Sequence, residues 1–282
     1  MSTRDNEDRF GSAQHQSDPP PPEPSPQALQ FAAPTEFVDL PSGGHYYPEG
    51  HPLCGVSSIE MKYMTAKDED ILVNKSYIKK GVVLDRLLQN LIVDKSIKVE
   101  DLLTGDKNAL LISARINGYG TDYEVKVSCP ACSKVVEFGF DLAESCNVRE
   151  PKLEQNEATH VGGNIFSFSL PVSKASVEVK LLFGTDERNL YKVSEMRTKN
   201  KLGDLGMTDY MKIYIHSING NEDISYISKC VDNMSVLDSK AIRSTYKDLT
   251  PTVDLAQQFA CPSCDHEQEM EVPFTSEFFW PK

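Results

Sequence analysis

The chain has 282 residues, a net charge of −13 at pH 7 and a pI near 4.9. Nucleic-acid backbones and anionic membranes both attract positive potential, so this charge argues against either as the main partner and favours protein partners. No apolar run approaches the roughly 20 residues of a transmembrane helix, and the polar N-terminus lacks the apolar core of a signal peptide. We therefore expect folding in a reducing cytoplasm, with no membrane involved.

Residues 1–33 differ in composition from the rest of the chain. They are charged and rich in Ser and Gln, and they contain a proline-rich stretch, PPPPEPSP, at residues 19–26. Too few apolar side chains are present to offset the entropy of ordering this segment, and its prolines favour extended polyproline II. We predict a disordered tail, with a PxxP ligand for a partner module as the alternative.

Segment 34–120 is expected to be mostly helical. It opens with Pro41-Ser42-Gly43-Gly44, a turn sequence, because glycine permits positive φ and proline restricts φ. We attribute the acidic residues 68–70 to the positive end of a helix dipole rather than to a cation site. The expected elements are a strand at 56–61, a helix capped by Thr65, a helix over 82–93, a short element at 99–103 and a helix from Asp106 to Gly118-Tyr119-Gly120.

Segments 121–145 and 251–282 share one pattern: a strand-like run, the sequence Cys-Pro-x-Cys and a second strand-like run. In the first segment the runs are 121–127 and 135–140, and in the second they are 253–259 and 267–272. Residues alternate between apolar and polar most clearly in the first of these runs, which is typical of a strand. Each segment is therefore predicted to be a β-hairpin that carries two cysteines on its turn.

Residues 146–250 separate the two cysteine hairpins. After an irregular polar stretch, the pattern predicts a second β-hairpin, with strands at 165–170 and 176–183 around a Pro-containing turn. The remainder is expected to be helical. The predicted helices are 186–198, 208–217, 222–231 and 235–246.

Four cysteines, Cys129, Cys132, Cys261 and Cys264, are the candidate metal ligands. Four thiolates on two tight turns are what a tetrahedral structural Zn²⁺ needs, and such a closed shell leaves no position for a substrate. A redox dithiol of similar spacing opens a helix, whereas strands follow both pairs here. Disulfides are disfavoured because the chain has seven cysteines and nothing suggests secretion.

The resulting prediction is an α+β fold with helical segments, a split four-cysteine zinc ribbon made of two Cys-Pro-x-Cys knuckle hairpins, and an inserted β-hairpin plus helices. No catalytic constellation stands out, so we do not expect an enzyme. The aromatic sequence Phe278-Phe279-Trp280 is the candidate partner contact, because aromatic residues dominate interface hot spots. Two arrangements of it remain open: folding back on the body, or insertion into a partner.

Five short motifs follow one another along the chain. They are Asp39-Leu40-Pro41-Ser42-Gly43-Gly44-x-Tyr46-Tyr47-Pro48, Met64-Thr65-Ala66-Lys67-Asp68-Glu69-Asp70-Ile71-Leu72, Asp101-Leu102-Leu103-x-Gly105-Asp106, Ile112-x-Ala114-Arg115-Ile116-x-x-Tyr119-Gly120 and Glu271-Val272-Pro273-Phe274-Thr275-x-x-Phe278-Phe279-Trp280-Pro281. In this order they resemble the T-even-type contractile-tail bacteriophage baseplate family, which includes a baseplate hub protein and a related assembly catalyst. The resemblance runs from about residue 37 to the end of the chain.

This resemblance implies a structural or assembly protein of the tail baseplate hub, found in the virion after assembly in the host cytoplasm. Its partners would be other phage baseplate and tail proteins. A permanent virion part and a transient assembly factor both fit. Two alternatives from other classes remain: a zinc-ribbon protein that binds a transcription or replication machine, and a thiol oxidoreductase with a low-pKa cysteine.

Overall fold

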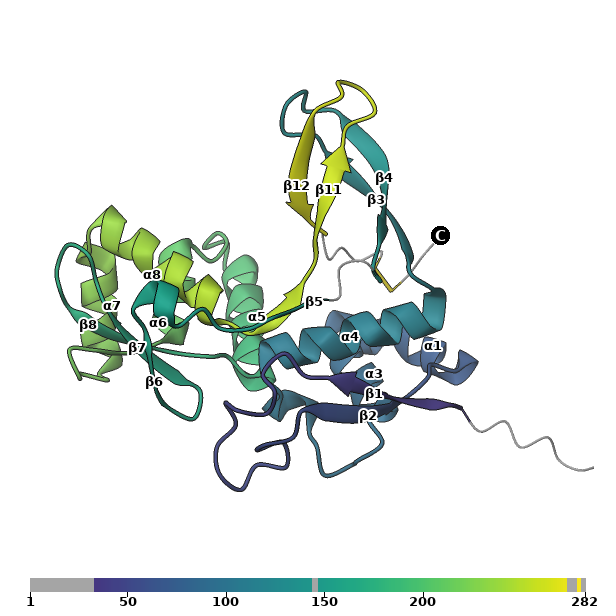
Figure 1. Ribbon diagram of the computed structural model, residues 1–282, viewed down its shortest axis with the longest axis horizontal. Coiled ribbons are helices and arrows are strands. Elements are labelled where there is room, and N and C mark those ends of the chain that lie inside the picture. Colours follow the sequence, from purple (N-terminus) through teal and green to yellow (C-terminus); the bar gives the residue numbers. More distant parts are fainter. Residues whose placement is uncertain (1–32, 144–146, 273–277, 280–282) are drawn as a thin grey trace, which may run out of the picture. The chain divides into compact units, whose positions relative to one another are not determined.

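The computed structural model describes residues 33–143, 147–272 and 278–279 (Figure 1). Nearly all of the predicted Pro-rich tail, together with Cys146 and Trp280, lies outside the described residues. No helix in the described part of the chain is both long enough and apolar enough to span a membrane.

The N-terminal part begins with a strand pair and continues as helices. Ile59 and Met61 of the second strand are buried, as the predicted alternation of residues 56–61 requires. The apolar stripe of the helix predicted at 82–93 is buried as well. The elements are β1 (Thr35–Asp39), antiparallel to β2 (Ser58–Lys62), then α1 (Ala66–Leu72), α2 (Lys75–Lys79), α3 (Val83–Leu91), the 3₁₀ helix η1 (Val99–Asp101) and α4 (Thr104–Tyr119).

The acidic first turn of α1 has a local structural role. Asp68 is buried, and one of its carboxylate oxygens accepts hydrogen bonds from the Thr65 backbone N–H at 2.8 Å and from the Thr65 hydroxyl at 2.7 Å. Its other oxygen accepts from the side-chain amide of Asn90 on α3. Asp68 therefore stabilises the start of α1 and joins it to α3, in agreement with the helix-terminus interpretation.

Helix α4 connects distant parts of the chain through a buried carboxylate near its start. Asp106 accepts hydrogen bonds from the backbone N–H and hydroxyl of Ser42, at 2.9 and 2.6 Å, and from the Tyr47 hydroxyl, at 2.7 Å. The Tyr47 hydroxyl in turn accepts the Leu103 N–H at 3.0 Å. The turn predicted at 41–44 is thereby held against the N-terminal end of α4.

A buried arginine stabilises the C-terminal end of α4. Arg115, 2% exposed, donates from its three guanidinium nitrogens to the carbonyl oxygens of Gly120, Asp122 and Phe278, at 2.7, 3.0 and 2.7 Å. Its donors therefore join the C-terminal end of α4 to the following strand and to the end of the described chain. Charge-assisted hydrogen bonds of this kind are stronger than neutral ones.

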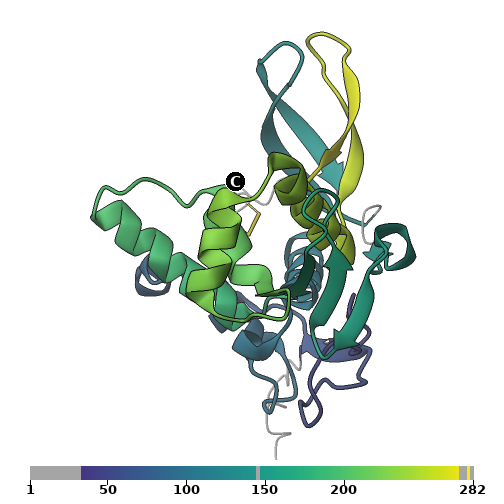
Figure 2. The same cartoon turned by 90° about the vertical axis from the view of Figure 1, so that its left-hand side faces the viewer.

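Two antiparallel hairpins follow the predicted cysteine pattern. One consists of β3 (Asp122–Ser128) and β4 (Val135–Asp141), and the other of β11 (Ala256–Ala260) and β12 (Glu267–Glu271). They are separate two-stranded sheets. Figures 1 and 2 show from two directions that they lie side by side, with their turns at the same end.

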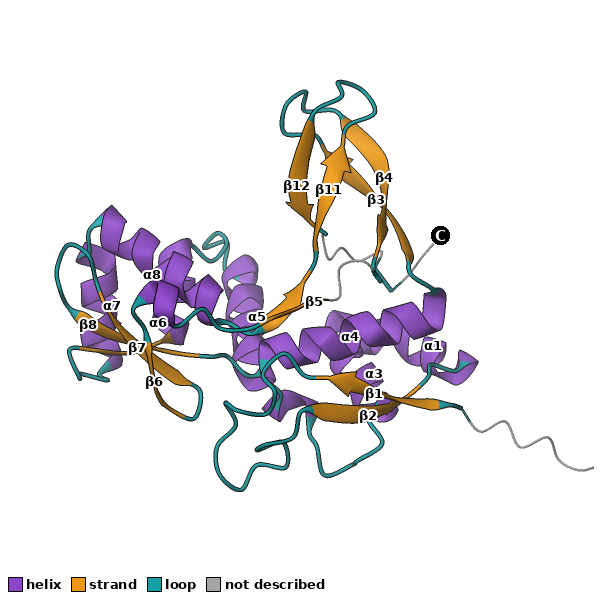
Figure 3. Ribbon diagram, viewed as in Figure 1, coloured by secondary structure: helices purple, strands orange, loops and turns teal. Residues whose placement is uncertain are grey.

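The segment between the hairpins leaves and returns through one short strand pair, β5 (Asn147–Arg149) with β10 (Thr252–Asp254), which packs on α4. Between these strands lies an antiparallel sheet of order β6-β7-β8-β9, accompanied by helices (Figure 3). The elements are η2 (Glu154–Asn156), β6 (Thr159–Gly162), β7 (Ile165–Ser169), β8 (Ser176–Lys180), α5 (Gly184–Lys199), α6 (Met207–Tyr214), β9 (Ile215–Ile218), α7 (Ile224–Asn233) and α8 (Val236–Leu249).

Two predictions for this segment are wrong in detail. The predicted hairpin is confirmed as β7 and β8, but residues 159–162, expected to be irregular, form the additional strand β6, which pairs with β7. The predicted helix over 208–217 ends at Tyr214, and its last residues enter β9, which pairs with β8. Ile215 and Ile218 are β-branched and buried in that strand, so sheet packing prevails over helical continuation.

Candidate metal centre

The first cysteine turn is a compact knuckle that follows β3. The Cys129 N–H donates to the Lys134 carbonyl at 2.9 Å, and the Ser133 N–H donates back to the Cys129 carbonyl at 2.8 Å. Ser133 adopts a left-handed conformation with φ of 57°, which reverses the chain and starts β4. These bonds hold the backbone between Cys129 and Cys132 in a tight turn.

The second turn has the same backbone geometry. The Cys261 N–H donates to the His266 carbonyl at 2.9 Å, the Asp265 N–H donates to the Cys261 carbonyl at 3.0 Å, and Asp265 has a φ of 54°. Both knuckles therefore place their first cysteine at the end of an incoming strand and the second inside the turn. Equivalent turns present their sulfur atoms in equivalent ways, as two halves of one site require.

The four sulfur atoms converge. All four Sγ atoms lie within 4.8 Å of one another, and the contacts between knuckles are 3.8 Å from Cys129 to Cys264 and 3.9 Å from Cys132 to Cys261. A tetrahedron with Zn–S bonds of about 2.3 Å has sulfur atoms about 3.8 Å apart. Cys129 and Cys261 are each 1% exposed, whereas Cys264 is exposed. Spacing and donor chemistry both fit a tetrahedral ion such as Zn²⁺ or iron.

The pKa values of two of the four thiols, Cys129 and Cys264, move in opposite directions. The backbone N–H of Cys132 is the main cause that lowers the pKa of the Cys129 thiol, to about 6. The backbone N–H of His266 lowers the pKa of Cys264, but desolvation and the other three cysteines outweigh it and raise that pKa to about 12. A divalent cation among the four sulfurs would allow all four to ionise.

The two hairpins also touch below the sulfurs. The Phe138 ring of β4 packs edge-to-face against Phe259 of β11, with ring centroids 5.0 Å apart. Farther along, the Gln257 amide accepts the Asp141 N–H at 3.2 Å and donates to the Asp141 carbonyl at 2.5 Å. The hairpins are thus joined by apolar and amide contacts as well as by the cysteines.

Gln257 is a member of this interface that sequence reasoning missed. Its signal is its register, because Leu255, Gln257 and Phe259 share one face of the strand and both apolar neighbours are buried. A glutamine at such an inward position needs a polar partner, and here the partner is a backbone edge of the other hairpin.

The predicted aromatic contact folds back on the body where it is described. Phe278 and Phe279 are 3% and 2% exposed, and the Phe278 ring packs edge-to-face on Tyr123 of β3 with centroids 5.2 Å apart. These two rings therefore adopt the first of the two expected arrangements. Trp280 lies outside the described residues.

Within the described part of the chain the four cysteines form the one cluster that could hold a metal, and the histidines and Cys230 lie outside it. His51 accepts the Leu53 N–H through Nδ1 at 3.1 Å and stacks on Tyr47, so it stabilises the turn in which it lies. Burial lowers the pKa of His51. The ring of His266 approaches the Gln268 side chain at 3.3 Å. Cys230 is half-buried against the core.

Comparison with known proteins agrees with the order of motifs in the chain. The model of the family described as "T4 bacteriophage base plate protein" matches residues 33–280. No curated protein and no solved structure matches significantly. Because the family match spans nearly all of the chain outside the predicted tail, including both cysteine knuckles, it applies to the whole described fold. The chain belongs to the T4 bacteriophage base plate protein family and is a phage baseplate protein.

Proposed function

We propose that this protein is a structural or assembly component of the hub region of a contractile tail baseplate, and that it acts through contacts with other tail proteins. In this proposal Cys129, Cys132, Cys261 and Cys264 hold one structural Zn²⁺. The observation that carries the metal assignment is the approach of four sulfur atoms, from knuckles more than a hundred residues apart, to within 4.8 Å of one another. The family match carries the baseplate assignment.

The donor set supports a structural role for the metal. Four sulfur ligands saturate a tetrahedral ion, so no coordination position remains for water or substrate. Bound zinc would neutralise the thiolates and connect β3–β4 to β11–β12. We accordingly propose a zinc ribbon split by an inserted segment, in a protein without enzymatic activity.

Hairpins held in a fixed relative position suit a protein that acts by binding other proteins through its surface. Edge-to-face aromatic packing and the Gln257 amide connect the two sheets at their base, and the metal would connect them at their turns. A metal clasp therefore restricts how the two hairpins move relative to each other. We propose that the resulting surface contacts neighbouring proteins during baseplate assembly in the host cytoplasm.

Metal analysis of the purified protein tests the zinc assignment. We expect close to one zinc per chain by inductively coupled plasma mass spectrometry, and a large loss in Cys261→Ser, whose oxygen is a poor substitute for a thiolate. Cys54→Ser is the matched control, because Cys54 is exposed and outside the cluster. Unchanged zinc content in Cys261→Ser, or iron in place of zinc, would contradict the assignment.

Mass spectrometry of purified phage tests the baseplate role. Peptides of this protein in intact virions, at a constant ratio to other tail proteins, would identify a permanent component. Their presence only in assembly intermediates would identify an assembly factor. Absence from both virions and tail intermediates of a phage that expresses the protein would refute the proposal.

A further inference from the structure

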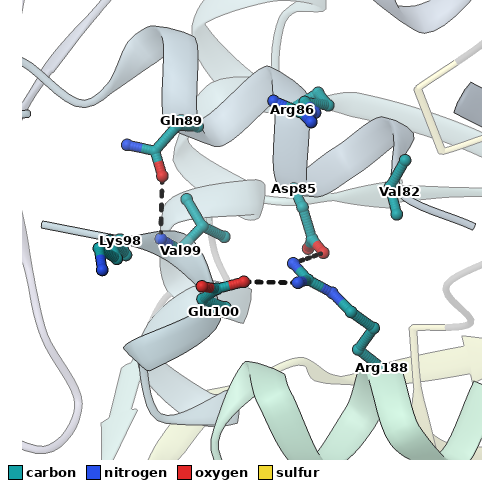
Figure 4. Close-up of a pocket in the computed structure, with 8 residues that line it drawn as sticks. All are labelled: Val82, Asp85, Arg86, Gln89, Lys98, Val99, Glu100 and Arg188. Carbon is teal, nitrogen blue, oxygen red and sulfur yellow. Dashed lines mark hydrogen bonds and ion pairs between the residues drawn. The ribbon is translucent and has the colours of Figure 1, made fainter.

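A polar pocket of about 350 Å³ lies away from the cysteines, at the junction of α3, the residues leading into η1 and helix α5. Figure 4 shows its lining residues gathered around a common space. Pockets of this size accommodate a few side chains rather than a duplex or a folded surface. It is lined by Val82, Asp85, Arg86, Gln89, Lys98, Val99, Glu100 and Arg188.

The two carboxylates of the pocket are already paired. The Arg188 guanidinium donates to Glu100 at 2.5 Å and to Asp85 at 3.4 Å. Asp85 also faces the Lys107 ammonium at 2.8 Å, and Lys107 is 11% exposed at its side chain. These cations largely compensate the negative charge of Asp85 and Glu100.

Two further cations line the pocket without such compensation. Arg86 and Lys98 are exposed, and neither forms an ion pair with any described residue. The Arg86 guanidinium lies 6.0 Å from the centroid of the Tyr77 ring, and no dashed line reaches either cation in Figure 4. Three cations and two paired carboxylates therefore give the pocket a net positive charge.

The chain segment that surrounds the pocket also has a positive net charge. Residues 75–101, which include most of the pocket lining, contain six Lys and Arg against four Asp and Glu, a net charge of +2, whereas the whole chain carries −13. A local basic region on an acidic protein attracts an acidic group, while the remaining charge repels an extended polyanion. The pocket is thus complementary to one or two carboxylates and not to a nucleic-acid backbone.

We propose that this pocket is a docking site for a carboxylate-bearing segment of a partner protein. Arg86 and Lys98 would bind its acidic side chains, and Val82, half-buried at the rim, would contact an adjacent apolar side chain. The site is independent of the cysteine centre. Through this site an acidic baseplate protein would bind an acidic segment of a neighbouring protein.

A binding assay with a defined probe tests the site. The probe is a fluorescein-labelled peptide of Leu-Glu-Glu repeats, measured by fluorescence polarisation with the full zinc-loaded chain. We expect wild type to bind it, and Arg86→Glu/Lys98→Glu to bind at least about tenfold more weakly, because like charges now face the peptide. Lys229→Glu/Lys240→Glu is the control: both lysines are exposed on α7 and α8, and the charge change is identical.

The outcomes separate specific docking from a general effect of charge. A change of less than about twofold in the control supports the pocket, because distant exposed charges are screened by salt. Equal weakening in both double variants, or no binding by wild type, overturns the proposal. So does tighter binding of single-stranded DNA that Arg86→Glu/Lys98→Glu abolishes.

Folding and zinc are checked in the same samples. Thermal unfolding and zinc content should match wild type, since neither side chain touches the cysteine centre. If the double variant does not fold, Lys98→Glu alone replaces it, because the Lys98 side chain makes no hydrogen bond or ion pair with described residues. Failure of peptide binding with normal zinc content refutes this site while leaving the proposed function standing.

Discussion

The proposed metal link between the two knuckles yields a quantitative prediction for stability. Cys132 and Cys261 are separated by 129 positions in the chain. Joining residues this far apart removes conformational entropy from the unfolded chain worth about 5 kcal/mol at 25 °C in the chain-entropy treatment. If zinc forms this link, replacing either knuckle pair by alanine should lower the free energy of unfolding by about that amount.

The same reasoning predicts strong non-additivity. The first double variant replaces Cys129 and Cys132, and the second replaces Cys261 and Cys264. Each abolishes the link, so the quadruple variant should be scarcely less stable than either double variant. The coupling energy of the cycle would then be about 5 kcal/mol, far above the few tenths expected for independent sites.

Guanidinium unfolding followed by circular dichroism, in zinc with a phosphine reductant, provides the measurement. Cys54→Ala is the control for a thiol outside the centre, and we expect it to change stability by less than about 0.5 kcal/mol. Additive losses from the two knuckle pairs would refute the reasoning, since they would mean that each pair acts alone. So would a chelator that leaves wild-type stability unchanged.

Three further predictions concern buried polar groups. Arg115→Met should lower the free energy of unfolding in urea by about 3 kcal/mol, because three carbonyl groups lose their donor while the aliphatic part of the side chain is kept. The control Lys199→Met, at an exposed site, should leave this free energy nearly unchanged. Tyr47→Phe should lower the free energy of unfolding by about 1–3 kcal/mol, because the buried Asp106 carboxylate loses a donor and the Leu103 N–H loses its acceptor. Faster hydrogen exchange at the Leu103 N–H would show the second loss. Burial raises the pKa of Asp238, but N–H donors from the β7–β8 turn outweigh it and hold that pKa below its usual value. Asp238→Asn should therefore lower Tm at pH 7 and lose its effect as pH falls below about 4; a pH-independent difference would contradict this.

Much of the local structure could be predicted from the sequence. The alternation Tyr123, Val125, Val127 marks β3, and all three side chains are buried. Serine at position 235 caps α8 by accepting the Asp238 N–H at 3.0 Å, so the predicted start of that helix is confirmed. These features depend on neighbours within a few residues, and such neighbours are visible in the sequence.

Strands that depend on distant partners could not be predicted. β5 has only three residues and carries no apolar period, and the single run predicted at 253–259 divides into β10 and β11, of which β10 pairs with β5. β5 and β10 form because each supplies hydrogen bonds to the other from the opposite end of the inserted segment. The buried roles of Arg115 and Asp106 could not be predicted for the same reason, because their hydrogen-bond partners lie up to 163 residues away in the sequence.

The sequence by itself determined which residues offer sulfur, that each cysteine pair sits on a hairpin turn, and that the motifs follow the order of a baseplate protein. Only the tertiary structure decided that the two hairpins meet, that Phe278 and Phe279 are buried, and that Arg86 and Lys98 share a pocket with Arg188. The reason is the entropy of the chain. Local elements are selected by interactions between near neighbours, whereas bringing distant segments together requires packing and hydrogen bonds summed over the whole core.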